Sequence, residues 1–377
     1  MKGISDMIKK TLLCIVAAVC ALPAMALRSG DMAEEPLLVK WYSGNHFRFA
    51  FPDTESNRNK LSVAVFLLCR APQAPATVMM LESLAAKYGE KLNVAVITPD
   101  NAEDLKTLLS MVPAKRISAG VDSERKLTAN FMAGSPLYPM AFVTDSRGRI
   151  LWNGEAVDLG EVVSNIYDGK FNAANAKKIS PLLDELHVCM RNNDDRRMNK
   201  VVREILSLDP GNAAALRIRL FSLEQRNRTI EAWQLLSEEL EKAPAISRLY
   251  FTGVDLILGD RFLSGQLEKL LVSFERNIKN PEHRALMAYT LCDRTSYNFT
   301  ALAMAEKLLK SLDDTRLSGA SAALCYAAKA AVAYRFCRLD EAIKNQEKSL
   351  AIWKTLKSPA NILSASAKLE YLRSIKK

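Results

Sequence analysis

The cysteines and histidines are the residues of this chain that could act as nucleophiles or metal ligands, if their spacing allows it. Five of its seven cysteines follow residue 26, and no two of them form a Cys-x-x-Cys pair. Cys69 ends an apolar run and precedes Arg70, whose charge could lower the thiol pKa and make Cys69 a lone nucleophile or peroxide-reactive thiol. The alternative is a core cysteine that points inward from a strand end. The histidines are far apart, which argues against a zinc site or a catalytic triad: His46, His187 and His283.

The other cysteines give no sign of a disulfide framework. Cys325 and Cys337 fall in one predicted helix, where 12 residues separate them by roughly 18 Å at 1.5 Å per residue. At that distance they cannot pair, so we expect most of these cysteines to be small buried hydrophobes. The sequence has no glycine-rich phosphate loop and no cluster of metal ligands, and it therefore predicts no cofactor and no metal.

The elements around Cys69 follow an α/β pattern. Residues 61–68 and 92–98 are apolar runs typical of strands buried on both faces. Helical stretches follow them, and residues 145–148 form a hairpin turn between two further strands. The predicted elements are strands at 61–68, 92–98, 140–144 and 149–152 and helices at 78–88, 103–112 and 158–167. The alternation predicts an α/β domain.

The segment from Tyr138 to Gly154 resembles a thioredoxin-fold signature, in which a cis-proline precedes a strand, an Asp-x-x-Gly turn and the next strand. It is similar, more narrowly, to exported thiol-disulfide redoxins of the TlpA and ResA kind, over about residues 37–170. Counted from Phe66, the register of that family places its two cysteines at positions 71 and 74. This chain has Ala71-Pro72-Gln73-Ala74 there instead.

The resemblance therefore implies a degenerate active site. Dithiol exchange needs a thiolate to attack and a second thiol to resolve the mixed disulfide, and alanine supplies neither. In the family, the proline loop faces this turn and docks an extended peptide. We call Ala71, Pro72, Gln73 and Ala74 together with Tyr138, Pro139 and Met140 the turn–proline surface. This surface either still binds a peptide or is a structural remnant.

The N-terminus has the three parts of a secretory signal peptide. Lys9 and Lys10 precede the apolar run 11–22, and Pro23 and Ala24-Met25-Ala26 follow it. The run is shorter than the about 20 apolar residues that cross a bilayer, and no later segment is long and apolar enough to do so. We expect cleavage after Ala26 and a mature chain in the periplasm or outside the cell; the alternative is an uncleaved anchor.

Helical repeats replace the strand pattern from about residue 180. A frame with apolar positions at +4 and +8 recurs at spacings of 34, 34, 35 and 41 residues, and only one +4 position is polar. It begins at Met198, Ala232, Gln266, Ala301 and Ala342. The frame resembles the second helix of the tetratricopeptide repeat, although the small residue expected in the first helix is present only once. Stacked hairpins of this kind leave a concave surface for a peptide or protein. The alternative is a plain helical bundle.

Charge gives a weaker indication of partners. The net charge of +10 comes from 52 basic and 42 acidic residues, without a dense basic stripe interleaved with aromatics, so we do not expect nucleic acid to be the partner. One unit of the repeat region carries four close arginines, which either favour an acidic partner or form a solvated face: Arg217, Arg219, Arg226 and Arg228.

The sequence thus predicts a signal peptide (1–26), an α/β thioredoxin-like domain (27–170), a polar linker (171–179) and an all-α tetratricopeptide-like solenoid (180–377). The predicted function is that of an exported, redox-inactive protein-binding or scaffolding module without enzymatic activity. Two alternatives remain: a thiol oxidoreductase or peroxidase that uses Cys69, and a chaperone-like holder of exported clients.

Overall fold

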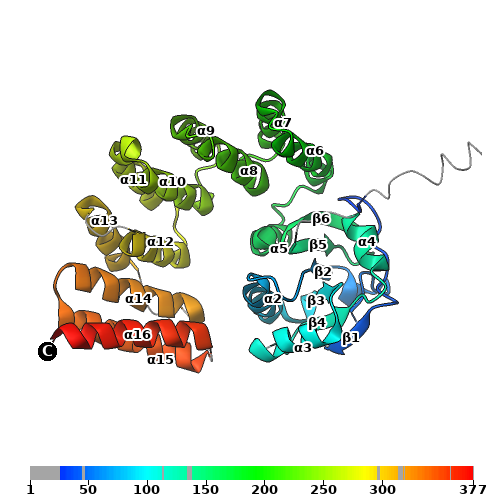
Figure 1. Ribbon diagram of the computed structural model, residues 1–377, viewed down its shortest axis with the longest axis horizontal. Helices are drawn as coiled ribbons and strands as arrows, with labels where there is room; N and C mark the ends of the chain where they lie inside the picture. Colours follow the sequence, from blue (N-terminus) through cyan, green and yellow to red (C-terminus); the bar gives the residue numbers. More distant parts are fainter. Residues whose placement is uncertain are drawn as a thin grey trace, which may run out of the picture. The chain divides into compact units, whose positions relative to one another are not determined.

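The computed structural model describes residues 26–44, 47–112, 114–133, 138–294, 298–312, 317, 319–356 and 358–376 (Figure 1). The chain divides into two compact units. The first runs to Leu208 and includes 213–215, and the second comprises 209–212 and 216–377. The predicted signal peptide lies almost entirely outside the described residues. Within them, no helix is long and apolar enough to span a membrane.

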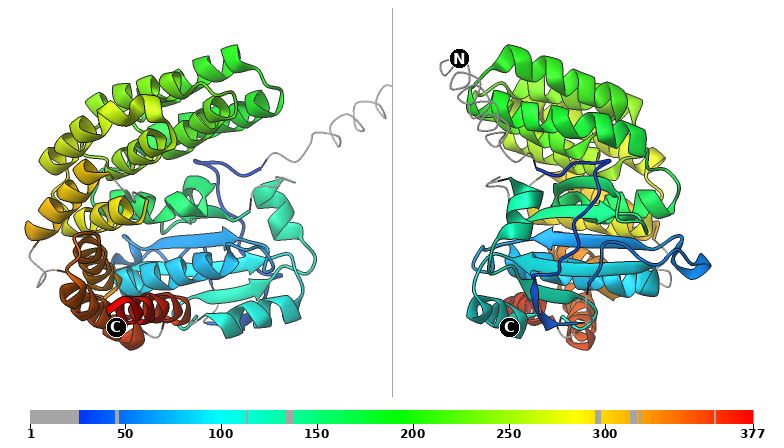
Figure 2. Two further views of the ribbon diagram at one scale, coloured as in Figure 1. Left: turned by 60° about the vertical axis from the view of Figure 1, so that its left-hand side comes forward. Right: turned by 90° about the vertical axis from the view of Figure 1, so that its right-hand side faces the viewer.

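A six-stranded mixed sheet forms the centre of the first unit (Figure 2). Its order is β1-β4-β3-β2-β5-β6; β2, β3 and β4 are mutually parallel, whereas β5 is antiparallel to β2 and β6 is antiparallel to β5. The strands are β1 Lys40–Ser43, β2 Leu61–Phe66, β3 Leu92–Thr98, β4 Ser118–Val121, β5 Met140–Thr144 and β6 Ile150–Glu155. A βαβ half followed by an antiparallel ββα half makes this part of the chain a thioredoxin-like α/β domain.

Each face of the sheet has its own core, because successive side chains of a strand point to opposite faces. On one face, Val63 and Val65 pack with α2 (Ala74–Tyr88), α3 (Ala102–Met111) and α5 (Leu159–Tyr167). On the other face, Phe66 and Phe142 pack with α4 (Lys126–Met132) and with Phe47 and Phe49. Both faces are covered, which is why β2 is buried at all six residues.

Most predicted elements of this domain are confirmed. Strands β3 and β5 have the predicted bounds, and the predicted turn closes through Gly148 N–H, which donates to the Asp145 carbonyl at 3.0 Å. Gly148 has φ +80°, a backbone conformation that favours glycine. The Tyr138–Pro139 peptide bond is cis, as the resemblance implies. Strands β1 and β4 and helix α4 were not predicted, because they are short and their residues show little periodicity.

The predicted linker at 171–179 differs from the structure, because α6 (Ala173–Arg191) begins inside it. The Asn172 side chain caps this helix by accepting a hydrogen bond from the backbone N–H of Asn175 at 3.0 Å. The alanines and lysines that follow favour helix, so the polar composition that suggested a joint belongs to a helix start. Helix α6 packs on β6, where the Ser180 hydroxyl donates to Asn153 Oδ1 at 3.1 Å. It continues into α7 (Asp195–Leu208), which completes the first unit.

The remaining helices follow one another in hairpins (Figure 1). They are α8 Ala213–Glu224, α9 Thr229–Lys242, α10 Ser247–Gly259, α11 Leu267–Asn277, α12 Pro281–Arg294, α13 Phe299–Lys310, α14 Gly319–Arg335, α15 Leu339–Thr355 and α16 Pro359–Lys376. Four of the five frame starts lie in the second helix of a hairpin and are fully or nearly fully buried: Met198, Ala232, Ala301 and Ala342. The fifth, Gln266, directly precedes α11.

The single polar +4 position of the frame is also buried. Gln346 is 3% exposed, and its side-chain amide donates to the Ala365 carbonyl of α16 at 3.1 Å. This bond satisfies the amide inside the core and fixes α16 against α15.

The five described cysteines are all free. Four are buried, as predicted, whereas Cys337 is exposed. The prediction that Cys325 and Cys337 share one helix is wrong, because α14 ends at Arg335 and Cys337 lies in the following turn with φ +58°.

Candidate functional site

The turn after β2 and the loop of Pro139 lie next to each other in the structure. Ala71 lies in the turn between β2 and α2, and Ala74 is the first residue of α2. The Ala74 N–H donates to the Ala71 carbonyl at 2.9 Å and closes the turn. The Gln73 side-chain amide donates to the Tyr138 carbonyl at 3.2 Å and so joins this turn to the loop of Pro139. Pro72 and Gln73 are exposed, whereas Ala74 is buried at the start of α2.

The proline loop is fixed on its other side by the sheet. Met140 begins β5 and lies opposite Phe66 of β2 and Glu155 of β6. The Pro139 carbonyl accepts a hydrogen bond from Ala156 N–H at 3.1 Å. The Tyr138 ring is half-buried, and its burial raises the pKa of its hydroxyl.

Cys69 is the thiol beside this surface, and it is held inside the protein. The residue is 8% exposed. Its backbone N–H donates to Asp100 Oδ2 at 2.6 Å, and its Sγ donates to the Thr98 hydroxyl at 3.5 Å. The pKa of the thiol is raised to about 11, chiefly by burial and also by the nearby carboxylates of Asp100 and Asp104, while the hydrogen bond with Thr98 opposes this rise. At neutral pH the thiol is therefore protonated and is a poor nucleophile.

Arg70 does not activate Cys69. Its guanidinium binds the Asp104 carboxylate with its Nε at 3.0 Å and its Nη2 at 2.9 Å. The Arg70 side chain is 81% exposed and the Asp104 side chain only 18%, so the guanidinium lies in solvent and is held by a half-buried carboxylate. The expected lowering of the Cys69 pKa by Arg70 is thus not found.

The residues that hold Cys69 were not predicted from the sequence. Thr98 ends β3, and its hydroxyl accepts hydrogen bonds from both Cys69 and the backbone N–H of Asp100. Asp100 and Asp104 follow the same strand. A usable signal was present, because Thr98-Pro99-Asp100 ends an apolar run, and the carboxyl ends of neighbouring parallel strands meet at one edge of a sheet.

The pH dependence of alkylation tests this environment. We expect iodoacetamide to label the exposed Cys337 near neutral pH and to leave Cys69 unmodified in the folded chain. Because the Cys69 pKa is raised to about 11, its thiolate fraction and its labelling should increase only as the pH approaches that value. The sites are read by peptide mass mapping, with unfolded protein as the control in which every cysteine is labelled. Rapid labelling of Cys69 near neutral pH would contradict the assignment.

The arginine group of the repeat region does not form one exposed face. Arg219 is 2% exposed, and Arg217 is half-buried. Arg228 binds Glu231 with its Nε at 2.5 Å from Oε1. One of the four arginines is therefore buried, and another is paired with a glutamate. The group is neither a solvated face nor a site of four arginines open to an acidic partner.

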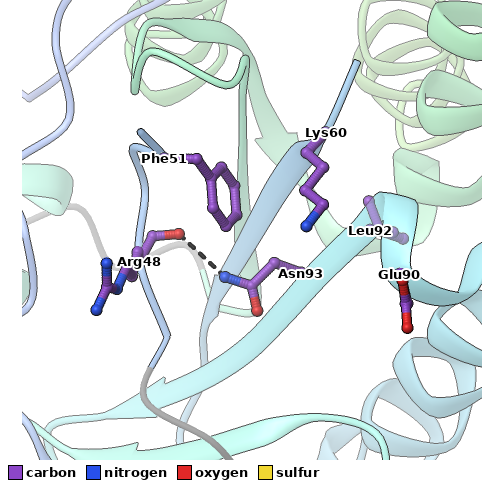
Figure 3. A pocket seen from close by; sticks show the side chains of 6 residues that line it. All are labelled: Arg48, Phe51, Lys60, Glu90, Leu92 and Asn93. Carbon is purple, nitrogen blue, oxygen red and sulfur yellow. Dashed lines mark hydrogen bonds between the residues drawn. The ribbon is translucent and has the colours of Figure 1, made fainter. Parts of the chain in front are cut away.

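A cavity of about 380 Å³ lies where β2 and β3 begin (Figure 3). Cys69 follows β2 at its other end. Four of its lining residues are charged or polar, and the other two are a phenylalanine and a leucine. The lining residues are Arg48, Phe51, Lys60, Glu90, Leu92 and Asn93. The Lys60 ammonium lies 5.5 Å from the centre of the Phe51 ring, and the Asn93 amide donates to the Arg48 carbonyl at 3.1 Å. Among the described residues, no group of three or more His, Cys, Asp or Glu side chains could hold a metal ion.

Comparison with known proteins gives matches to solved structures only, each over part of this chain. No family model and no curated protein matches the chain. A protein described as the thiol:disulfide interchange protein DsbE of Chlorobium tepidum is 16% identical, with a TM-score of 0.29 over 38% of this chain and 98% of its own. The bacterioferritin comigratory protein of Xanthomonas campestris is 11% identical, with a TM-score of 0.30 over 37% of this chain and 96% of its own.

A peroxiredoxin-like protein of Aquifex aeolicus is 15% identical, with a TM-score of 0.31 over 39% of this chain and 90% of its own. The thioredoxin-like fold of this chain follows from its own strand order, in which a parallel β2–β3–β4 part is joined by an antiparallel β5–β6 part.

Proposed function

We propose that this chain is an exported, redox-inactive thioredoxin-like protein that binds a protein or peptide through its helical repeats. The observation that carries the proposal is the state of Cys69. The thiol next to the turn–proline surface is buried, hydrogen-bonded to Thr98 and protonated at neutral pH, because its pKa is raised to about 11.

The turn itself supplies no second thiol. Ala71 and Ala74 occupy the two positions from which the related redoxins attack and resolve a disulfide, and a methyl group can do neither. A one-cysteine mechanism at Cys69 would need the thiol to leave its hydrogen bond with Thr98 and reach solvent. The turn–proline surface therefore lacks the accessible thiols that disulfide exchange requires.

The helical repeats are the stronger candidate for binding. On the turn–proline surface, the Gln73 side chain holds the Tyr138 carbonyl of the proline loop by a hydrogen bond. The helical hairpins, in contrast, repeat with the tetratricopeptide-like frame, whose buried positions leave the other helix faces free for a partner. Export is proposed from the N-terminal sequence pattern, with the mature chain in the periplasm or outside the cell.

An activity assay tests the proposal. We expect residues 27–377 to show no insulin-disulfide reduction and no peroxide consumption above the blank, with a dithiol thioredoxin as the positive control. The Cys69→Ser variant should behave identically, because the thiol that it removes is buried and protonated. Activity in the parent chain that is lost in Cys69→Ser would overturn the proposal and favour a one-cysteine oxidoreductase or peroxidase.

A further inference from the structure

The cavity at the start of β2 and β3 holds a half-buried lysine between two apolar side chains. Lys60 directly precedes β2, Leu92 begins β3, and Phe51 belongs to the segment before β2. Figure 3 shows the Lys60 side chain between Phe51 and Leu92, with its ammonium directed towards Asn93. The cavity volume of about 380 Å³ lies within the range of small-molecule sites.

The Lys60 ammonium has no carboxylate partner within the part of the chain that the structure describes. Glu90 lines the same cavity, yet the two residues form no ion pair. Instead, the Lys60 ammonium lies 5.5 Å from the centre of the Phe51 ring. The face of a ring compensates a half-buried charge less than a charge-assisted hydrogen bond does. An anion in the cavity would therefore bind Lys60 more strongly than the ring does.

The Asn93 amide places a second hydrogen-bond donor beside Lys60. One of its N–H groups donates to the Arg48 carbonyl at 3.1 Å, and the Ser62 hydroxyl donates to the same carbonyl at 2.7 Å. The second N–H of Asn93 has no acceptor among the described residues and can donate to a ligand. The segment that carries the ring is fixed as well, because the Phe51 N–H donates to the Ser146 carbonyl at 2.9 Å. The donors and the ring are thus held in place before a ligand binds.

The charges of the lining select a single negative charge. Arg48 and Lys60 are cationic and Glu90 is anionic, so one positive charge is left over. Glu90 lies at the edge of the group, beyond Leu92 (Figure 3). A monoanion matches this balance, whereas Glu90 would repel a dianion such as a phosphate monoester. The apolar side chains of Phe51 and Leu92 in turn suit a flat, apolar body.

We propose that this cavity binds a small aromatic monocarboxylate. The carboxylate accepts hydrogen bonds from the Lys60 ammonium and from the second N–H of Asn93, and the aromatic body packs against Phe51 and Leu92. This site goes beyond the proposed binding of a protein partner by the helical repeats and does not depend on it.

The probe is 4-fluorobenzoate, whose binding to residues 27–377 is measured by the broadening of its fluorine NMR resonance. We expect a dissociation constant on the order of millimolar, as is usual for a ligand of about ten heavy atoms. Three further probes each change one property of the ligand. Trifluoroacetate has the charge without the ring, 4-fluorobenzyl alcohol has the ring without the charge, and 4-fluorophenyl phosphate is a dianion. All three should bind more weakly than 4-fluorobenzoate.

Substitution of Lys60 tests the charge contact. The Lys60→Gln variant should bind 4-fluorobenzoate about tenfold more weakly, because it loses a charge-assisted hydrogen bond, whereas Lys60→Arg should keep most of the affinity. The matched control is Lys91→Gln, which removes an exposed lysine next to Glu90 that does not line the cavity. It should retain parental affinity, and circular dichroism should show that all variants are folded.

Substitution of Glu90 tests the preference for a single charge. The Glu90→Gln variant removes the anionic side chain of the lining and should strengthen binding of 4-fluorophenyl phosphate more than binding of 4-fluorobenzoate. An equal effect on both probes would contradict the selection of a monoanion.

The inference is overturned if 4-fluorobenzoate does not bind the folded parent chain at millimolar concentration, or if Lys60→Gln and Lys91→Gln weaken its binding equally. It is also overturned if trifluoroacetate or 4-fluorobenzyl alcohol binds as tightly, or if the phosphate binds the parent chain more tightly. None of these results bears on the redox-inactive assignment, which depends on Cys69 at the other end of β2.

Discussion

Replacing Ala71 and Ala74 together by cysteine should convert the inactive chain into a disulfide reductase. The turn that carries them is closed, precedes α2 and is joined to the loop of the cis-proline by the Gln73–Tyr138 hydrogen bond. A thiol at the start of a helix has a lowered pKa, and a second thiol three residues later can resolve a mixed disulfide. We expect insulin reduction by residues 27–377 of the double variant to exceed the parental background by about tenfold or more.

The matched control is Ala71→Ser/Ala74→Ser, which adds polar atoms at the same places without thiols and should stay at background. The two single cysteine variants should also remain inactive in turnover, because neither has a resolving thiol. If the folded double variant forms a disulfide at these positions and still fails to reduce insulin, then the loss of the cysteines does not explain the inactivity of the parent chain.

Phe131→Ala should produce the largest loss of stability in the thioredoxin-like domain. The Phe131 ring is fully buried, and its centre lies 5.1 Å from the centres of Phe49 and Phe66 and 4.9 Å from that of Phe142. Truncation leaves a cavity among these rings, and such substitutions lower the free energy of unfolding by about 3–5 kcal/mol. The midpoint of urea unfolding, followed by near-ultraviolet circular dichroism, measures the change.

Phe299→Ala is the matched control, because Phe299 is 78% exposed at the start of α13 and loses few contacts. It should change the free energy of unfolding by less than about 0.5 kcal/mol. A similar loss in both variants would mean that the aromatic cluster is not the centre of this core.

The sequence indicated the thioredoxin-like order because its central strands are continuous apolar runs. Leu92–Thr98 and Met140–Thr144 are buried on both faces and have the bounds expected from composition alone. Strand β4 could not be found in this way, because Ser118-Ala119-Gly120-Val121 has little apolar content. Gly120 is required there by packing, since a Cβ would lie 2.4 Å from Val39 and 2.8 Å from Trp41, which are far away in sequence.

The candidate site, like the fold, could be predicted only in part. The positions of Ala71, Ala74 and Pro139 follow from local motifs, and the structure brings this turn and the proline loop together. The environment of Cys69 depends on Thr98 and Asp100, which lie 29 and 31 residues further along the chain. Arg70 was expected to act on its sequence neighbour, but it pairs instead with Asp104. These contacts form because β2 and β3 end side by side in the sheet. The order of residues along the chain does not show which side chains meet there.

The most direct measurement is a mass-mapped thiol inventory of residues 27–377 after exposure to hydrogen peroxide or to a disulfide-bonded peptide near neutral pH. If the chain is redox-inactive, adducts should form at the exposed Cys337, and Cys69 should be recovered as an unmodified thiol. A mixed disulfide or a sulfenic acid at Cys69 in the folded protein would contradict the proposal, because it would show that the buried, protonated thiol reaches solvent and reacts.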